Sequence, residues 1–274
     1  MWLKFGLHNP KEEALFFMLQ DRNFTSSAVR QRCPYCSKAQ FTVDHVATRC
    51  GKLLPTQYIH RHNEVVKCIH LHILQKYNLT TNKKLRLHKV TSVIENSNAR
   101  IVSDLPVHTE LKISCNKPDI TVFDKINNRI FLIEIGITSL DNVVSYEYEK
   151  VHKYGVLARE LRAMHNMPVT IIPYVMTWDG VVTSYNSKYR SQLGLSDRIQ
   201  AYIQTVALKQ TLALVFSNAE IKLAASPTTQ LPVKEPVVMS CNVTDSKIGK
   251  RRRINEEEND VTAGLKAQSK DGNE

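Results

Sequence analysis

Apolar residues recur along much of this chain at the three-to-four-residue spacing that is typical of amphipathic helices. The longest such stripe follows Pro55 and consists of Ile59, His62, Val66, Ile69 and Ile73. A second stripe, within residues 143–165, consists of Val151, Tyr154, Ala158 and Leu161. Residues 11–20 and 196–216 have the same helical character. The pattern therefore predicts four helices.

Other segments alternate with the two-residue period of strands. Residues 85–95 predict a strand with Leu85, Leu87, Lys89, Thr91 and Val93 on one face. Residues 120–123 and 129–135 predict a hairpin, because Lys-Ile-Asn-Asn at 125–128 forms a suitable turn between them. Residues 168–177 predict the last strand. The order of elements predicts an α/β fold with a mixed sheet.

Composition supports a folded body of one large domain or two modest ones. Hydrophobic residues make up 42% of the 274 residues and charged residues 23%, which excludes wholesale disorder. The chain contains no run of about 18 uncharged apolar residues, and its first ten residues lack the order of a signal peptide. We therefore expect no membrane association and no secretion.

Residues 226–274 are rich in Pro, Thr, Asn and charge, and this composition predicts a disordered tail. The tail contains Lys250-Arg251-Arg252-Arg253, which is typical of a nuclear-import or DNA-tethering patch. A solvated charge run is an equally good interpretation of these four residues.

The net charge points to a polyanionic partner. Lys and Arg total 37 against 26 Asp and Glu, a formal charge of +11. From residue 226 onward eight basic and eight acidic residues cancel, so residues 1–225 carry the whole excess, with 29 basic and 18 acidic residues. A basic folded body favours nucleic acid over a membrane, because the chain has no lipidation motif or basic amphipathic helix.

Three of the six cysteines lie in a pattern typical of a zinc knuckle. The spacing is Cys33-x2-Cys36-x8-His45-x4-Cys50, and soft thiolates with one imidazole suit a tetrahedral Zn²⁺. Four protein ligands leave no open position, so the predicted zinc is structural. His60, His62 and Cys68 lie close enough in the sequence to be alternative ligands. The sparse cysteines also favour a reducing compartment over a disulfide framework.

Two carboxylates flank the predicted hairpin. If the chain turns at residues 125–128, residues whose numbers sum to 253 face each other, so Asp119 faces Glu134. Opposed side chains have Cβ atoms ~5 Å apart, where like charges are destabilising. A divalent cation between the two carboxylates would resolve the repulsion. In the alternative interpretation, Asp119 belongs to a turn and Glu134 pairs with a nearby Lys or Arg.

Two helical segments carry candidate contacts for phosphate. Lys150 and Tyr154 are four residues apart and share a face, with Lys153 one position round, so a cation here could hold a scissile phosphate. A solvated helix face is the alternative. In Arg61-His62-Asn63, the outer two residues could reach backbone phosphates, whereas the place of His62 on the apolar stripe also fits a hydrogen-bonded core histidine.

These motifs follow one another in a specific order. A CCHC knuckle is followed by Arg-His-Asn, then Lys-Pro-Asp at 117–119, Glu134 after one hairpin, and Glu-Lys-x-x-Lys-Tyr at 149–154. Leu19-Gln20-Asp21 and Tyr58 add to the series. The chain resembles the C-terminal region of site-specific non-LTR retrotransposon proteins that carry a restriction-like endonuclease. The resemblance spans residues 2–177 and extends more loosely to 216.

The resemblance implies the fold of PD-(D/E)xK nucleases, which is similar to that of archaeal Holliday-junction resolvases. It implies a helix and zinc knuckle at 1–54, a three-layer restriction-endonuclease-like core at 55–185, and a helical extension at 186–225 before the tail. Pro118-Asp119 matches the PD and Glu134 the second acid. Gly136 stands where that fold usually has its lysine, so the lysine role falls to Lys150 or Lys153 on the following helix.

The resemblance further implies an Mg²⁺-dependent endonuclease that nicks double-stranded DNA in the nucleus and leaves a 3′-hydroxyl. The implied catalytic residues are Asp119, Glu134, Lys150, Lys153 and Tyr154, and Arg61, His62 and Asn63 are the implied DNA contacts. Element RNA is a further implied partner. The chain has no Asp-Asp pair, so we expect an endonuclease without its reverse transcriptase. The alternatives are an inactive nucleic-acid-binding relic and a structure-specific, resolvase-like nuclease.

Overall fold

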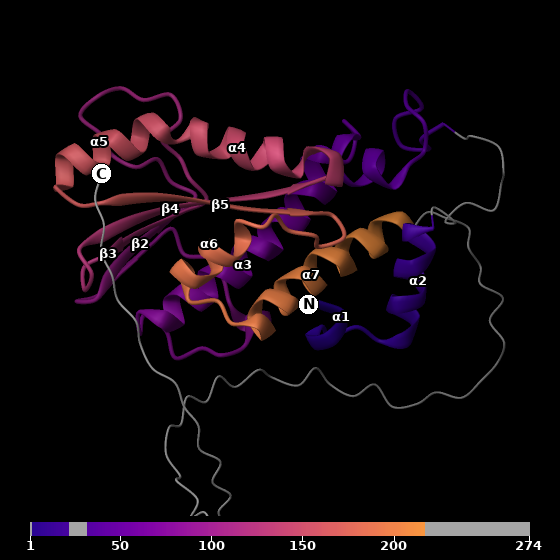
Figure 1. Ribbon diagram of the computed structural model, residues 1–274, viewed down its shortest axis with the longest axis horizontal. Coiled ribbons are helices and arrows are strands. Elements are labelled where there is room, and N and C mark those ends of the chain that lie inside the picture. Colours follow the sequence, from indigo (N-terminus) through magenta and orange to yellow (C-terminus); the bar gives the residue numbers. More distant parts are fainter. Residues whose placement is uncertain (1, 22–31, 217–274) are drawn as a thin grey trace, which may run out of the picture. The chain divides into compact units, whose positions relative to one another are not determined.

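Helices cover both faces of a mixed five-stranded sheet (Figure 1). This computed structural model describes residues 2–21 and 32–216. The strands lie in the order β1-β2-β3-β4-β5, and β5 is parallel to β4 whereas the other neighbours are antiparallel. Their bounds are Val93–Glu95, Ala99–Ser103, Ile120–Asp124, Arg129–Thr138 and Val169–Thr177. The predicted α/β class and mixed sheet are confirmed.

The helices lie in two groups. Figure 1 shows α4 (Val143–Lys153) and α5 (Gly155–His165) on one face of the sheet, with α3 (Ile59–Lys76), α6 (Asn186–Leu193) and α7 (Asp197–Phe216) on the other. The remaining helices are α2 (Pro10–Gln20), the short α1 (Trp2–Phe5), and the single turns η1 (His45–Arg49), η2 (Leu54–Tyr58), η3 (Leu85–Leu87) and η4 (Leu140–Asn142). No helix in the described ranges is both long enough and apolar enough for a bilayer span.

The central hairpin has the predicted register. Ile120 pairs with Ile133 and Phe123 with Ile130, so paired residue numbers sum to 253. The turn is held by Asp124, whose side chain accepts hydrogen bonds from the backbone N–H of Asn127 at 3.1 Å and from Nε of Arg129 at 3.0 Å. This local side-chain-to-backbone bond fixes where the chain reverses, and therefore fixes which residues of β3 and β4 are opposite.

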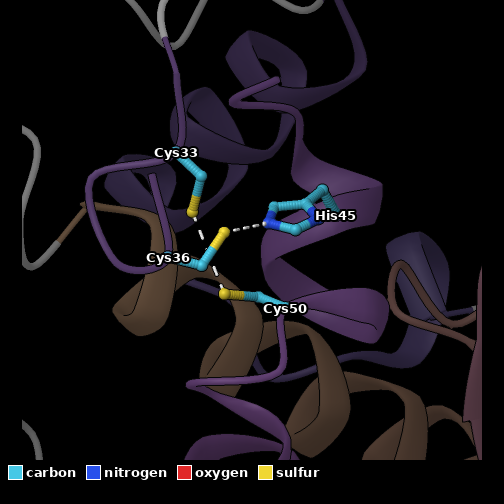
Figure 2. A group of neighbouring side chains, drawn as sticks. All are labelled: Cys33, Cys36, His45 and Cys50. Atoms are coloured by element: carbon cyan, nitrogen blue, oxygen red, sulfur yellow. Dashed lines mark hydrogen bonds between the residues drawn. The ribbon is translucent and has the colours of Figure 1, made fainter. Parts of the chain in front are cut away.

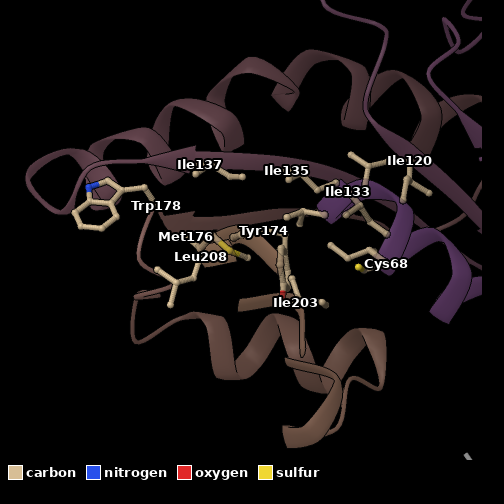
Figure 3. Close-up of a cluster of buried hydrophobic side chains, with 14 of the residues drawn as sticks. Cys68, Ile120, Ile133, Ile135, Ile137, Tyr174, Met176, Trp178, Ile203 and Leu208 are labelled. Atoms are coloured by element: carbon tan, nitrogen blue, oxygen red, sulfur yellow. The ribbon is translucent and has the colours of Figure 1, made fainter. Parts of the chain in front are cut away.

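Strand β4 lies in the middle of the core and is buried on both faces. Its odd-numbered residues Ile133, Ile135 and Ile137 pack with side chains of α3 and α7 (Figure 3). Its even-numbered residues Ile130 and Leu132 pack against α5 in a second cluster. A strand covered on both faces reads as a continuous apolar run, which makes the buried Glu134 exceptional.

The predicted strand at 85–95 is wrong over most of its length. Leu85–Leu87 forms a helical turn, and β1 covers Val93–Glu95 alone. Leu87 is 63% exposed, and the backbone N–H of His88 bonds to the Leu85 carbonyl at 3.0 Å instead of to a strand. Leu85-Arg86-Leu87 is therefore a helical turn, and it places His88 against His70 of α3. The strand that pairs with β3 on the side away from β4 is β2, which was not predicted.

The predicted helix at 143–165 is two helices that meet at Tyr154, whose ψ of 6° departs from helical geometry. Gly155 follows at once, and glycine weakens a helix interior. Val151 is exposed, contrary to its predicted place on the buried stripe, and Leu157 is buried instead. Residues 22–31 and 217–274, with the predicted tail and its basic patch, lie outside the described residues, and the predicted domain division stays a prediction.

Candidate functional site

The four predicted knuckle ligands converge (Figure 2). Ligand atoms of Cys33, Cys36, His45 and Cys50 all lie within 4.8 Å of one another. Sγ of Cys33 and Sγ of Cys50 are 3.9 Å apart, and Sγ of Cys36 is 3.3 Å from Nε2 of His45. Tetrahedral Zn²⁺ with Zn–S bonds of ~2.3 Å places sulfurs about 3.8 Å apart, so this group fits a structural Zn²⁺. The group does not include His60, His62 or Cys68.

Local backbone geometry creates the ligand cluster. The N–H of Ser37 bonds to the Cys33 carbonyl at 2.8 Å, which closes the tight turn of the Cys-x2-Cys segment. The η1 turn brings His45 and Cys50 together, since the Cys50 N–H bonds to the His45 carbonyl at 2.7 Å. Backbone N–H groups of Lys38 and Ala39 lower the pKa of Cys36 to about 6. A thiolate is the form that binds metal, so Cys36 is prepared for a cation.

The knuckle is attached to the end of the sheet where β4 and β5 finish. A guanidinium nitrogen of Arg49 donates to the Ser139 hydroxyl at 3.0 Å, just after β4. Nε1 of Trp178, just after β5, donates to Oδ1 of Asp44 at 2.8 Å. Arg61 on α3 donates to the carbonyl of Ala47 within η1. The cluster therefore holds a segment that braces two strands and α3.

The two predicted carboxylates are neighbours at one end of the β3–β4 hairpin. The backbone N–H of Asp119 donates to Oε2 of Glu134 at 3.3 Å, and the N–H of Ile135 donates to Oδ2 of Asp119 at 2.7 Å. The side chain of Glu134 is only 6% exposed, whereas that of Asp119 is 22% exposed. Register places the acids together, and reciprocal bonds to the backbone hold them there.

Three side chains from the region of α4 meet the buried Glu134. Nζ of Lys150 lies 2.8 Å and Nζ of Lys153 lies 2.9 Å from its Oε1. The Tyr154 hydroxyl lies 2.8 Å from its Oε2 and 2.9 Å from the Lys117 carbonyl oxygen. Burial and then the charge of Glu134 raise the pKa of Tyr154, so this phenol stays protonated as a donor.

The contacts of Glu134 with two lysines remove one reason for expecting a metal between the carboxylates. Two ammonium groups already offset the repulsion between Asp119 and Glu134, so the repulsion by itself does not require a metal. Glu134 is thus paired with lysine, as in the alternative interpretation of the sequence. Asp119 differs, because no partner within the described residues contacts its Oδ1. That oxygen remains available to a ligand.

His62 on α3 joins the carboxylates instead of packing in the core. Its Nε2 lies 3.2 Å from Oδ2 of Asp119, and its Nδ1 lies 3.2 Å from Oδ1 of Asn63. Burial opposes protonation, but the hydrogen bond to Asp119 and the charge of Asp119 outweigh it and raise the pKa of His62. His62 thus helps to hold Asp119 in place.

Arg61, a predicted DNA contact, has no exposed surface in this structure. Arg61 is fully buried, and its guanidinium donates to the Ala47 carbonyl and, at 3.3 Å, to the Thr211 hydroxyl. Burial lowers the pKa of Arg61 to about 10. Its role is to join α3, α7 and the knuckle. Asn63 is exposed, so a contact with phosphate through Asn63 stays a prediction.

Gly136 and Tyr146 explain how a lysine from α4 reaches the carboxylates. A methyl group at position 136 would lie 2.7 Å from Cε1 of Tyr146, so only glycine leaves room for this ring against β4. Nζ of Lys150 lies 5.0 Å from the centre of the same ring, so the ammonium group and the ring form a cation–π contact. The hydroxyl of Tyr58 lies 3.5 Å from the hydroxyl of Tyr146. Sequence reasoning missed Tyr146, although a glycine within a buried strand often marks such a close approach.

Comparison with the known protein families finds no match for this chain, and comparison with curated proteins finds none either.

Proposed function

We propose that this chain is an Mg²⁺-dependent DNA endonuclease with a restriction-endonuclease-like core. We further propose that it is the endonuclease part of a non-LTR retrotransposon protein. One observation carries the proposal: Asp119, Glu134, Lys150, Lys153 and Tyr154 converge on one end of the central hairpin. Two carboxylates beside lysine ammonium groups, with one carboxylate partly exposed, are typical of sites that hydrolyse phosphodiesters.

The resemblance and the geometry support each other at Gly136. The nuclease fold usually has a lysine there, and this chain has a glycine that admits Tyr146, on which Lys150 rests. The two lysines of α4 bond to Glu134 at 2.8 and 2.9 Å. A lysine of α4 therefore contacts the second acid, Glu134, in place of a lysine at position 136. The resemblance implies this change in the position of the lysine.

Asp119 and Glu134 are the residues that would hold Mg²⁺. When bound, Mg²⁺ supplies a Lewis acid for the phosphate oxygen and a site for the attacking water. Lys150 and Lys153 would pair with the phosphate, where a preformed positive charge stabilises the charge that develops in the transition state. Tyr154 and His62 would act as positioning residues, because they fix the orientation of Glu134 and Asp119.

Binding of DNA would come from the basic body as a whole. Residues 1–225 carry 29 basic and 18 acidic residues, and contacts of Lys and Arg with phosphate supply affinity without sequence preference. The proposed Zn²⁺ has a different role. It would keep η1 in place against β4 and β5 and would take no part in the chemistry.

The test is incubation of the purified chain with supercoiled plasmid and with branched DNA, with Mg²⁺ and in buffer without it. We expect nicked plasmid with Mg²⁺ alone, and 3′ ends that a DNA polymerase extends. Binding without cleavage of either substrate would refute the endonuclease and favour a binding module. Cleavage restricted to branched DNA would favour the resolvase-like nuclease instead.

A further inference from the structure

A pocket opens on the same face of the sheet as Glu134, beside Met164 and His165 at the end of α5. Its volume is about 400 Å³, within the range of ~300–1,000 Å³ that is usual for small ligands. Val93, Val102 and Phe123 line its apolar part. None of the residues assigned to the carboxylate cluster lines it, so the pocket is a separate feature of the described residues.

The pocket offers surfaces suited to a planar ring. Cζ of Arg100 lies 5.9 Å from the centre of the Phe123 ring, and the imidazole of His165 meets that ring edge-on at 5.4 Å between centres. Aromatic rings and guanidinium planes are the groups on which proteins stack unpaired bases. A nucleobase therefore fits this pocket better than an aliphatic chain does.

The charge of the pocket favours an anionic ligand. Arg100 supplies a charged guanidinium, His108 and His165 add imidazole nitrogens that can hydrogen-bond, and none of its described lining residues is Asp or Glu. Arg100 has a 3.7 Å ion pair with Glu95, but both side chains are about half exposed, at 50% and 47%. Such a solvated pair contributes little stability, so a phosphate group can replace Glu95 at low cost.

The pocket and the carboxylates lie along one strand. Phe123 pairs with Ile130, and Ile130, Leu132 and Glu134 alternate onto one face of β4, so Phe123 and Glu134 share a face. Asp119 and Phe123 are four residues apart, which is about 13 Å along β3. In a duplex this distance corresponds to about four base steps of one strand.

We infer that this pocket binds an unpaired nucleotide of the DNA strand whose backbone passes the carboxylates. The base would stack against Phe123 and Arg100, and its phosphate would meet Arg100, His108 or His165. The inference rests on the proposed function for its ligand, but the pocket is assigned from its own residues. It would fix the distance between an unpaired base and the cut.

The experiment measures affinity for a labelled single-stranded hexanucleotide in buffer without Mg²⁺, so that cleavage does not enter. The same oligonucleotide with an abasic site, placed at each position in turn, reports the contribution of each base. We expect one abasic position to weaken binding about tenfold, because stacking of one base on an aromatic side chain is worth that much. Phe123→Leu and Arg100→Gln should each reduce this difference.

Phe17→Leu is the matched control, since Phe17 is half exposed on α2 and does not line the pocket. It should leave the tenfold difference unchanged. If abasic sites weaken binding by the same factor in the wild type, Phe123→Leu and Arg100→Gln, the pocket does not bind a base. Cleavage of plasmid by the wild type would in that case still support the endonuclease. The reverse result, base-dependent binding without cleavage, would keep the pocket and refute the endonuclease.

Discussion

Glu134 is the residue whose surroundings say most about the proposed chemistry. Its side chain is 6% exposed, and two lysines, one phenol and one backbone N–H surround its two oxygens. A buried carboxylate is stable only when paired and hydrogen-bonded, and here the pairing is complete. Any ligand that binds Glu134 must therefore compete with Lys150 and Lys153, which ties the behaviour of the two lysines to that of the carboxylate.

At Lys150, replacement by alanine should reduce cleavage more than the same change at Lys153. Lys150 is 15% exposed and rests on Tyr146, whereas Lys153 is 39% exposed. Loss of a preformed cation at the phosphate should cost ~2 to 4 kcal/mol in activation free energy, and loss of the more solvated one under ~1 kcal/mol. Single-turnover rates of both variants check this, and Lys150→Arg should restore part of the activity.

Equal, mild losses in Lys150→Ala and Lys153→Ala would mean that neither lysine acts on the phosphate. A larger loss at Lys153 would reverse their roles and leave the endonuclease standing.

The buried pair of His70 and His88 should make the fold sensitive to acid. Their ring nitrogens lie 2.8 Å apart, and burial followed by the charge of His88 lowers the pKa of His70 to about 4. A histidine with a lowered pKa contributes stability above its unfolded value of ~6.5, and this is lost as pH falls toward 4. The free energy of unfolding should fall by about 3 kcal/mol more in the wild type than in His70→Gln between pH 7 and pH 4.

Urea unfolding at several pH values measures this difference. Parallel pH profiles in the two proteins would show that folding does not change the pKa of His70, contrary to the expectation.

Sequence reasoning placed Asp119 and Glu134 together because a turn and a register are local properties. It misplaced Arg61, since hydrophobic periodicity gives no reason for a guanidinium to be fully buried between α3, α7 and the knuckle. His62 shows the same limit. Its contact with Asp119 joins residues 57 positions apart, and only the packing of α3 against the sheet brings them together.

At the scale of elements, the segments with many long-range partners were predicted well. α3 carries a clear helical period, whereas the hairpin, β5 and α7 stand out as apolar segments because they are buried on more than one face. The edge of the sheet was predicted only in part: β1 is the last three residues of the strand predicted at 85–95, and its pattern is mostly exposed. A short edge strand has few apolar positions to reveal it, and β2 carries its signal in Ala99, Ile101 and Val102 next to exposed polar residues.

The contact between β4 and α4 should depend on Gly136. A methyl group there would overlap Tyr146, so Gly136→Ala should displace the ring and the lysine that rests on it. We expect at least a tenfold loss of cleavage with unchanged DNA binding. Gly155→Ala is the matched control, because nothing lies within 4 Å of an added methyl group at that position.

If Gly136→Ala cleaves as fast as Gly155→Ala, the position of Tyr146 does not matter for the site. Tyr146→Ala combined with Gly136→Ala tests the same point, since it removes the overlap but also the support of Lys150.

The knuckle should contribute to stability and not to chemistry. Natively purified protein should contain about one Zn²⁺, and Cys36→Ser should lower the free energy of unfolding by about 3 kcal/mol, because metal binding is coupled to folding. Cys115→Ser is the control, since Cys115 lies outside the ligand group. Metal analysis together with chemical unfolding measures both effects.

Protein without zinc, or a Cys36→Ser variant as stable as Cys115→Ser, would contradict the structural role. A variant that folds normally but has lost cleavage would assign the cluster a part in the chemistry.

At the scale of the whole molecule, binding and cleavage should depend on different residues. The positive charge is spread over the folded body, whereas the chemistry is assigned to one end of one hairpin. Distributed contacts with phosphate give an affinity that falls steeply as salt rises, and one carboxylate contributes little to that dependence. Separation of the two properties therefore distinguishes a catalytic carboxylate pair from a purely structural one.

The most direct test replaces the acids by their amides, Asp119→Asn and Glu134→Gln, which nearly preserve shape. Cleavage of supercoiled plasmid with Mg²⁺ and affinity for a DNA duplex are measured on the same preparations. We predict that both variants lose cleavage by at least a thousandfold and bind DNA as tightly as the wild type or slightly more tightly, since a negative charge near the phosphate is lost. Loss of binding together with cleavage, or cleavage at the wild-type rate, would contradict the proposed site.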